Sequence, residues 1–227
     1  MLILGLDVST ACVGIAVINE HKQPLLVGAV SINHINTVKD KVSAVLDAIS
    51  KYVLLLGSVD LIVVEQSLQA FRPGLSSANT ICSLAKMNGV TSVLTEMFAD
   101  APVNYVSSQT ARKLCGIKII KGRDTKTQVV DWALNNCLSS WSVPKKQRSD
   151  DAANQVKDAI DALVVAIGGL ILIEQESDSV LKNKNDKHDN NINSSSVLAK
   201  STRTDNCIKI WKGSICKMSI SVVPVEA

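Results

Sequence analysis

Four acidic side chains lie where metal chemistry could take place. Asp7 comes near the end of an apolar run rich in β-branched residues, and Glu65 ends another such run. A charged group at such a position is costly unless a cation or hydrogen-bond donors compensate it. Asp158 and Asp161 are three residues apart on a predicted helix, so both carboxylates lie on one face. Taken singly, Asp7 also suits a turn, Glu65 a surface, and the helical pair a solvated helix start.

Together the four carboxylates would repel one another strongly, and such a cluster usually holds hard divalent cations. Mg²⁺ prefers oxygen ligands and keeps several waters, so a few carboxylates and a substrate phosphate suit it. Two Mg²⁺ ions about 3.5 to 4 Å apart, for which Mn²⁺ could substitute, would activate a water and stabilise the leaving oxygen in phosphodiester hydrolysis. The acids therefore predict metal-dependent hydrolysis, with all four as ligands and catalytic groups.

Cationic residues gather ahead of the helical acids. The net charge of +3 does not identify a partner. Between residues 112 and 126, however, a single acid, Asp124, accompanies a dense set of cations: Arg112, Lys113, Lys118, Lys121, Arg123 and Lys126. A second group is Lys145, Lys146 and Arg148. These clusters fit either solvated loops or a phosphate-binding rim.

The elements that must position these residues follow from apolar periodicity. Strands are predicted at Leu2–Val8, Val13–Ile18, Leu25–Ile32, Val59–Val64 and Val103–Val106. Helices are predicted at Val38–Leu56, Ser76–Phe98, Ser107 or Ser108 to Leu114, Thr125–Leu138, and about Asp151 or Asn154 to Ile173, with Gly168 and Gly169 as a weak point in the last. Three strands followed by alternating helices and strands predict an α/β domain, with a mixed β-sheet flanked by helices on both faces.

Composition divides the chain into three parts. Residues 1–175 carry the predicted domain. After Glu176 the chain becomes rich in Asn, Ser, Lys and Asp, which predicts a disordered polar linker at 176–206. The more apolar residues 207–227 form a tail of unassigned role.

Several features favour an intracellular protein that is not secreted. No basic residue precedes the apolar start, which reaches Asp7 too early for a signal peptide. The apolar run Ile160–Ile173 is shorter than the roughly 20 residues that span a bilayer, so no membrane span is predicted. The six cysteines show no C-x-x-C spacing, which favours free thiols over a zinc site.

The order of strand Asp, strand Glu and helical Asp-x-x-Asp resembles that of RuvC-like Holliday junction resolvases, in the ribonuclease H-like superfamily. The hairpin Gly5-Leu6-Asp7-Val8-Ser9-Thr10 with Gly14-Ile15-Ala16-Val17 is similar to the first motif of that family. Glu65-Gln66 with Ala70 resembles the second motif, and Lys126-Thr127-Gln128-Val129 the basic segment. Asp158-Ala159-Ile160-Asp161-Ala162-Leu163 is the most specific match. The resemblance covers about residues 1–174.

This resemblance implies a ribonuclease H-like fold and a homodimer that nicks four-way DNA junctions symmetrically in recombination and repair. It assigns metal binding to Asp7, Glu65, Asp158 and Asp161, and phosphate contact to Lys126 and Lys113; the same basic rim would include Arg112, Lys121 and Arg123. The family places a stacking aromatic soon after the second acid, but Leu68 stands three residues after Glu65. Phe71 is the nearest aromatic, and it suits either stacking on a base or packing under its loop.

Other departures and rivals remain open. Asp150 and Asp151 are extra acids that could assist the metal or mark a helix start. A DEDD-type transposase or a general nuclease would use the same acids, but a transposase needs a further domain. Sugar-kinase and actin-like ATPases begin with a similar hairpin, yet need Gly-rich phosphate loops that the sequence lacks. A silent DNA-binding scaffold would be expected to have lost some of the acids.

Overall fold

A five-stranded mixed sheet organises the chain, with strand order β3-β2-β1-β4-β5. In the computed structural model, residues 1–67, 77–138 and 150–185 are described, with side chains except at 53–54, 150–153 and 180–185. The first three strands form two consecutive antiparallel pairs, while β4 and β5 run parallel to β1. The strands are β1 (Leu2–Val8), β2 (Cys12–Asn19), β3 (Pro24–Ser31), β4 (Leu61–Glu65) and β5 (Val103–Val106).

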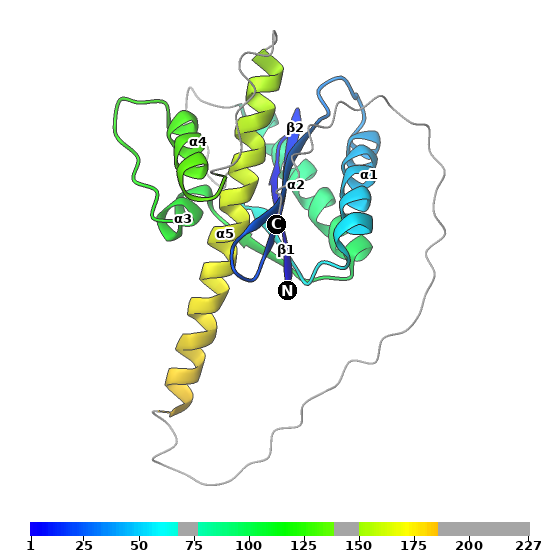
Figure 1. The fold of residues 1–227 in the computed structure, drawn as a ribbon. Coiled ribbons are helices and arrows are strands. Elements are labelled where there is room, and N and C mark those ends of the chain that lie inside the picture. Colours follow the sequence, from blue (N-terminus) through cyan, green and yellow to red (C-terminus); the bar gives the residue numbers. More distant parts are fainter. Residues whose placement is uncertain (68–76, 139–149, 186–227) are drawn as a thin grey trace. The chain divides into compact units, whose positions relative to one another are not determined.

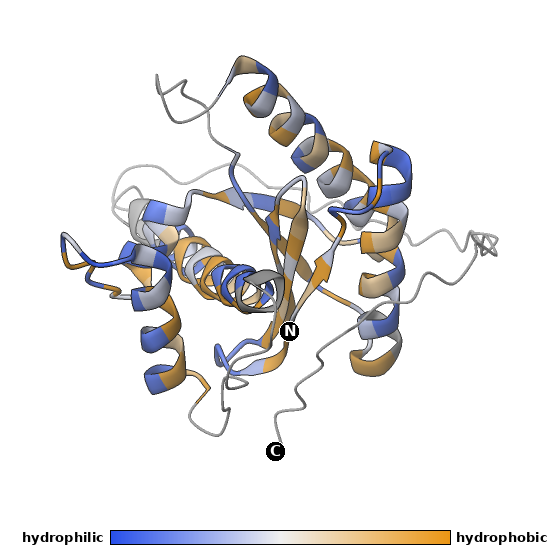
Figure 2. Ribbon diagram, turned by 90° about the horizontal axis from the view of Figure 1, so that it is seen from above, coloured by the Kyte–Doolittle hydropathy of each residue, from blue (hydrophilic) through white to orange (hydrophobic). Residues whose placement is uncertain are grey.

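Helices cover both faces of this sheet (Figures 1 and 2). One face is covered by α1 and α2, and the other by α5 with α3 and α4 beside it (Figure 1). The helices are α1 (Val38–Leu56), α2 (Ala78–Ala99), α3 (Ser108–Leu114), α4 (Thr125–Asn136) and α5 (Asp150–Asn185). The chain thus has the predicted α/β architecture, a mixed sheet with helices on both faces.

The alternation of side chains along each strand divides the core between the two faces. In β1, Ile3 packs into the cluster that includes α5, whereas Leu4 faces the apolar space lined by Ile49 and Tyr52 of α1. The middle of α5, from Ala159 to Leu170, is buried along its whole length. The apolar run around Asp161 is therefore a core helix, as predicted. None of the helices described has the length and hydropathy needed to cross a membrane.

Side-chain caps begin three of the helices. Ser77, Ser107 and Asp124 accept hydrogen bonds from the backbone N–H groups of Thr80, Thr110 and Thr127. Such caps satisfy amide groups that have no partner within the helix. Ser107 is thus the cap of the short helix α3, which confirms one of the two predicted starts.

The predicted end of α5 near residue 174 is wrong, because the helix continues to Asn185. Residues 174–185 contain no Gly or Pro and are rich in Glu, Gln and Lys, which favour helices. The start of the predicted linker is therefore helical. Residues up to Ile173 form one compact unit, and Glu174–Asn185 belong to a second. Residues 186–206 and the tail lie outside the described residues, so the three-part division stays a prediction.

The two glycines predicted to weaken α5 are packed against other elements instead. A Cβ on Gly168 would lie 2.6 Å from the Cα of Ala111 in α3. A Cβ on Gly169 would overlap the side chain of Val63 in β4. These contacts with the sheet and with α3 explain why the helix passes through both positions.

Candidate metal centre

Strand parity brings Asp7 and Glu65 to the same face of the sheet. Asp7 is two residues beyond Gly5, which packs against α5, and Glu65 is two residues beyond Val63, which packs against Gly169 of the same helix. Because β1 and β4 are parallel and pair Leu6 with Val64, the two acids follow at the same edge. The strands therefore present two carboxylates beneath α5.

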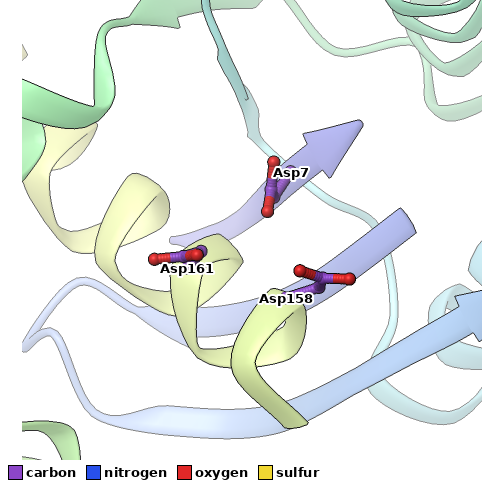
Figure 3. Close-up of side chains that lie close together, drawn as sticks. All are labelled: Asp7, Asp158 and Asp161. Atoms are coloured by element: carbon purple, nitrogen blue, oxygen red, sulfur yellow. The ribbon is translucent and has the colours of Figure 1, made fainter. Parts of the chain in front are cut away.

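Close packing of α5 brings the helical acids onto these strands. Gly14 lies opposite Asp7 in the hairpin, and a Cβ there would lie 2.6 Å from the carbonyl carbon of Asp158 and 3.1 Å from the Cβ of Ala162. Only a residue without a side chain lets the helix backbone come so near. Asp158 and Asp161 are one turn apart on this side of the helix (Figure 3).

Three of the predicted acids converge. Asp7, Asp158 and Asp161 each offer an oxygen, and these oxygens all lie within 4.8 Å of one another (Figure 3). The side chains of Asp158 and Asp161 are only 16% and 8% exposed. Three hard oxygen donors in a protected site fit a divalent cation such as Mg²⁺. The structure thus contains an acidic triad that could bind a metal.

Glu65 is not part of this triad, but its charge interacts with the charges of Asp7 and Asp161. Burial raises the pKa of Glu65, and the charge of Asp161 raises it further, while Arg112 opposes the shift. A hydrogen bond with Ser108 also lowers the pKa of Glu65. Asn88 holds the strand end in place, since its Nδ2 donates to the Glu65 carbonyl oxygen at 2.9 Å.

Asp7 and Asp161 resist ionisation when only protein groups surround them. Burial raises the pKa of Asp7 well above its usual value, with further increases from the charges of Glu65, Asp161 and Asp158. Burial likewise raises the pKa of Asp161, against the lowering effect of Lys126 and Arg112. A bound divalent cation would compensate the same charges, so the electrostatics fit metal binding.

Two of the predicted basic residues contact the carboxylates directly. The Nζ of Lys126 lies 2.7 Å from Asp158 Oδ1 and 3.7 Å from Asp161 Oδ2. A guanidinium nitrogen of Arg112 lies 3.6 Å from Asp161 Oδ1. Burial lowers the pKa of Lys126, but its hydrogen bond to Asp158 and the nearby charges outweigh this and raise it. Arg112 and Lys126 thus lie at the acidic site and not on a separate outer rim.

The remaining predicted residues lie further out or outside the described part of the chain. Lys113, Lys121 and Arg123 are exposed. Asp150 and Asp151 belong to the first turn of α5, but their side chains are not described. Phe71 lies outside the described residues, so its predicted stacking role stays open.

Sequence reasoning missed three groups at this site: Ser108 and Asn88, which hold Glu65, and Cys12. Cys12 shares the α5-facing side of β2 with Ala16 and Ile18. Burial, followed by the charge of Asp158, raises the pKa of Cys12. Strand parity could have placed Cys12 beside the acids. Ser108 and Asn88 gave no such local signal, because tertiary packing alone brings them to Glu65.

Solved structures share this fold. The Thermus thermophilus RuvC in complex with a Holliday junction substrate matches with a TM-score of 0.55 and 14% identity, over 77% of this chain and 96% of that one. A second structure of Thermus thermophilus RuvC matches with a TM-score of 0.51 and 16% identity, over 78% of this chain and 97% of that one. The yeast mitochondrial Holliday junction resolvase Ydc2 matches with a TM-score of 0.51 and 12% identity, over 81% and 83%.

These likenesses confirm the predicted RuvC-like, ribonuclease H-like fold. At 12 to 16% identity, they establish the fold and not the reaction. No protein-family model and no curated protein matches the sequence.

Proposed function

We propose that this chain is a metal-dependent endonuclease that resolves four-way DNA junctions by paired phosphodiester hydrolysis, in recombination and repair. The observation that carries the proposal is the convergence of Asp7, Asp158 and Asp161 within 4.8 Å. The fold likeness to RuvC bound to a Holliday junction substrate supports the choice of branched DNA. Such a protein would work inside the cell, where its DNA substrate is.

In the proposed reaction, Asp7, Asp158 and Asp161 would hold Mg²⁺, and Glu65 would contribute to the binding of a second ion. Mn²⁺ would serve in the same place, because it also accepts oxygen ligands. The bound ions would supply an activated water and stabilise the leaving oxygen. The chain's own contribution is to hold the carboxylates at fixed positions, since Asp7 and Glu65 lie on buried strands and the other two on a core helix.

In this proposal, Lys126 and Arg112 also contact the substrate. Both cations compensate the charge of the carboxylates that they contact, Asp158 and Asp161. A bound divalent ion would compensate the same charges, which would leave the two side chains available to contact a phosphate of the substrate. The exposed Lys113, Lys121 and Arg123 would contact the neighbouring phosphates.

Symmetric cutting of a junction needs two active sites, and α2 offers a surface for a homodimer. Its buried residues are mostly polar: Met87, Asn88, Thr91, Ser92 and Thr95. Its exposed residues include a large apolar set: Val90, Val93, Leu94, Met97 and Phe98. A helix with this distribution leaves apolar area in water unless a partner covers it. A second copy of the chain, packed through the same face, would cover it on both subunits.

The decisive experiment incubates the full chain with a four-way junction, a flap and a plain duplex, each with and without Mg²⁺. We expect paired nicks in the junction only, and only with metal. Asp7→Asn should abolish cutting but keep junction binding, because an amide binds Mg²⁺ poorly yet fills the same space. Cutting of all three DNAs would indicate a general nuclease, and cutting by Asp7→Asn at the parental rate would refute the metal centre.

A further inference from the structure

A short loop ahead of α4 exposes two isoleucines among cations. We define this basic loop as residues 116–123. Ile119 and Ile120 are 41% and 55% exposed. Lys118, Lys121 and Arg123, on either side of them, are exposed as well. Large apolar side chains that are exposed to water contribute little to the stability of the isolated chain, so this pair indicates a surface that binds a partner.

The loop is held in shape by its own hydrogen bonds. Gln128 of α4 accepts a hydrogen bond from the Ile120 N–H at 2.8 Å and donates to the carbonyls of Ile120 and Arg123 at 3.2 Å each. At the other end Ile117 is buried, and its N–H donates to the Arg112 carbonyl at 2.9 Å. The isoleucines are therefore presented by a built turn, anchored on both sides.

This loop leads straight into the acidic site. Asp124, the residue after it, caps α4 and lies 3.9 Å from Lys157 of α5. Lys126, in the first turn of α4, reaches Asp158 at 2.7 Å. The same turn thus connects the exposed isoleucines with the carboxylates of the proposed metal centre.

We propose that Ile119 and Ile120 insert against an unstacked base step of branched DNA, while Lys118, Lys121 and Arg123 hold the flanking phosphates. Apolar wedges commonly enter base steps that are already weak, and the steps at a branch point are weaker than those of a duplex. The surrounding cations favour a polyanion over a protein surface. The surface area of two side chains is also far smaller than the roughly 800 Å² that each partner buries in a stable protein interface. This inference rests on the proposed function and adds a group that selects branched over linear DNA.

The test uses the full chain in EDTA, so that DNA is bound without cutting, and a four-way junction carrying 2-aminopurine beside the branch point. The parent should raise the fluorescence of that base, because unstacking relieves its quenching, and should not do so within a duplex arm. Ile119→Ser/Ile120→Ser should lose this increase and bind the junction at least about tenfold more weakly, about 1.4 kcal/mol. Its salt dependence should stay unchanged, since no charge is altered. Leu55→Ser, which changes an exposed apolar side chain of α1 (73% exposed), is the matched control and should behave as the parent.

The outcomes separate this inference from the proposed function. If the parent chain cuts junctions and the double variant keeps both its fluorescence increase and its affinity, the wedge is refuted and the nuclease stands. If the double variant instead changes only the sedimentation of the chain, the isoleucines bind protein and the wedge is again refuted. A parent chain that neither binds nor cuts a junction would overturn both.

Discussion

Gly14→Ala tests whether close backbone packing sets the acidic site. The new Cβ would lie 2.6 Å from the carbonyl carbon of Asp158, and nearer still to its oxygen. Ordinary carbon contacts begin at about 3.5 Å, so the helix backbone must retreat by about 0.9 Å or more at Asp158. Because Gly14 lies opposite Asp7, this movement separates two members of the triad.

Both stability and cleavage should fall. Overpacking of this kind costs about 1–3 kcal/mol, which for a chain of this size lowers Tm by roughly 2–12 °C. A misplacement near 1 Å in a catalytic group can reduce the rate about 100-fold. The rate loss should therefore exceed what the loss of folded protein explains at a temperature where the variant is still folded.

Thermal unfolding and a metal-dependent junction cleavage assay measure the two effects. Gly89→Ala in α2 is the matched control, because a Cβ there meets nothing within 4 Å. It should raise stability by about 0.5–1 kcal/mol, as alanine does in helices, and leave cleavage unchanged. If Gly14→Ala melts and cuts like the parent, the close approach of α5 to β2 is not a feature of the protein in solution.

Three further results are expected. In EDTA, the parent should lose stability as the pH rises from about 4, because the raised pKa of Asp7 means that its ionisation disfavours the fold. Asp7→Asn lacks this ionisation, so in urea unfolding it should become more stable relative to the parent over the same pH range. A parallel pH dependence of the two proteins would contradict this. Lys126→Ala should strengthen Mn²⁺ binding in calorimetry, since its ammonium occupies Asp158, yet lower the salt slope of DNA binding by about one; the exposed Lys51→Ala in α1 should change neither. Met97→Lys should convert the proposed dimer to a monomer in sedimentation, whereas Leu55→Lys should not; an unchanged dimer would remove α2 from the interface.

Much of the fold could be predicted because its signals are local. The bounds of Val38–Leu56 and Val103–Val106 agree with the structure residue for residue. Apolar runs also predict that Asp7 and Glu65 lie at strand ends, where the two acids can converge on one site. The convergence of three acids follows from these local patterns once β1 and β4 pair in parallel, and the pattern of alternating strands and helices favours that pairing.

The remainder depended on contacts between distant segments. No periodicity indicates that Arg112 and Lys126 reach Asp161 and Asp158, and the sequence alone groups both with the other basic residues of 112–126. In α2, apolar and polar residues occur around the whole helix, and only the tertiary structure shows that Thr91 and Thr95 are buried while Met97 is exposed. The polar composition after Glu176 predicts a linker, but residues 174–185 contain no Gly or Pro and continue the helix to Asn185.

The same contacts imply that metal binding will stabilise the fold. Asp7, Asp158 and Asp161 are held together by the packing of Gly5 and Gly14 against α5, against their mutual repulsion. A cation that binds only the folded state removes part of that repulsion, and at a hundred times its dissociation constant it adds about 2.7 kcal/mol.

For a chain of this length, that stabilisation corresponds to a rise in Tm of about 5–11 °C. We expect Mg²⁺ and Mn²⁺ to raise the Tm of the parent by this amount, relative to KCl at the same ionic strength. Asp161→Asn should show a much smaller rise, because Asp161 supplies one of the three converging oxygens. An ion that binds only the folded state must stabilise that state. If neither ion changes the Tm of the parent, the acids converge without binding metal.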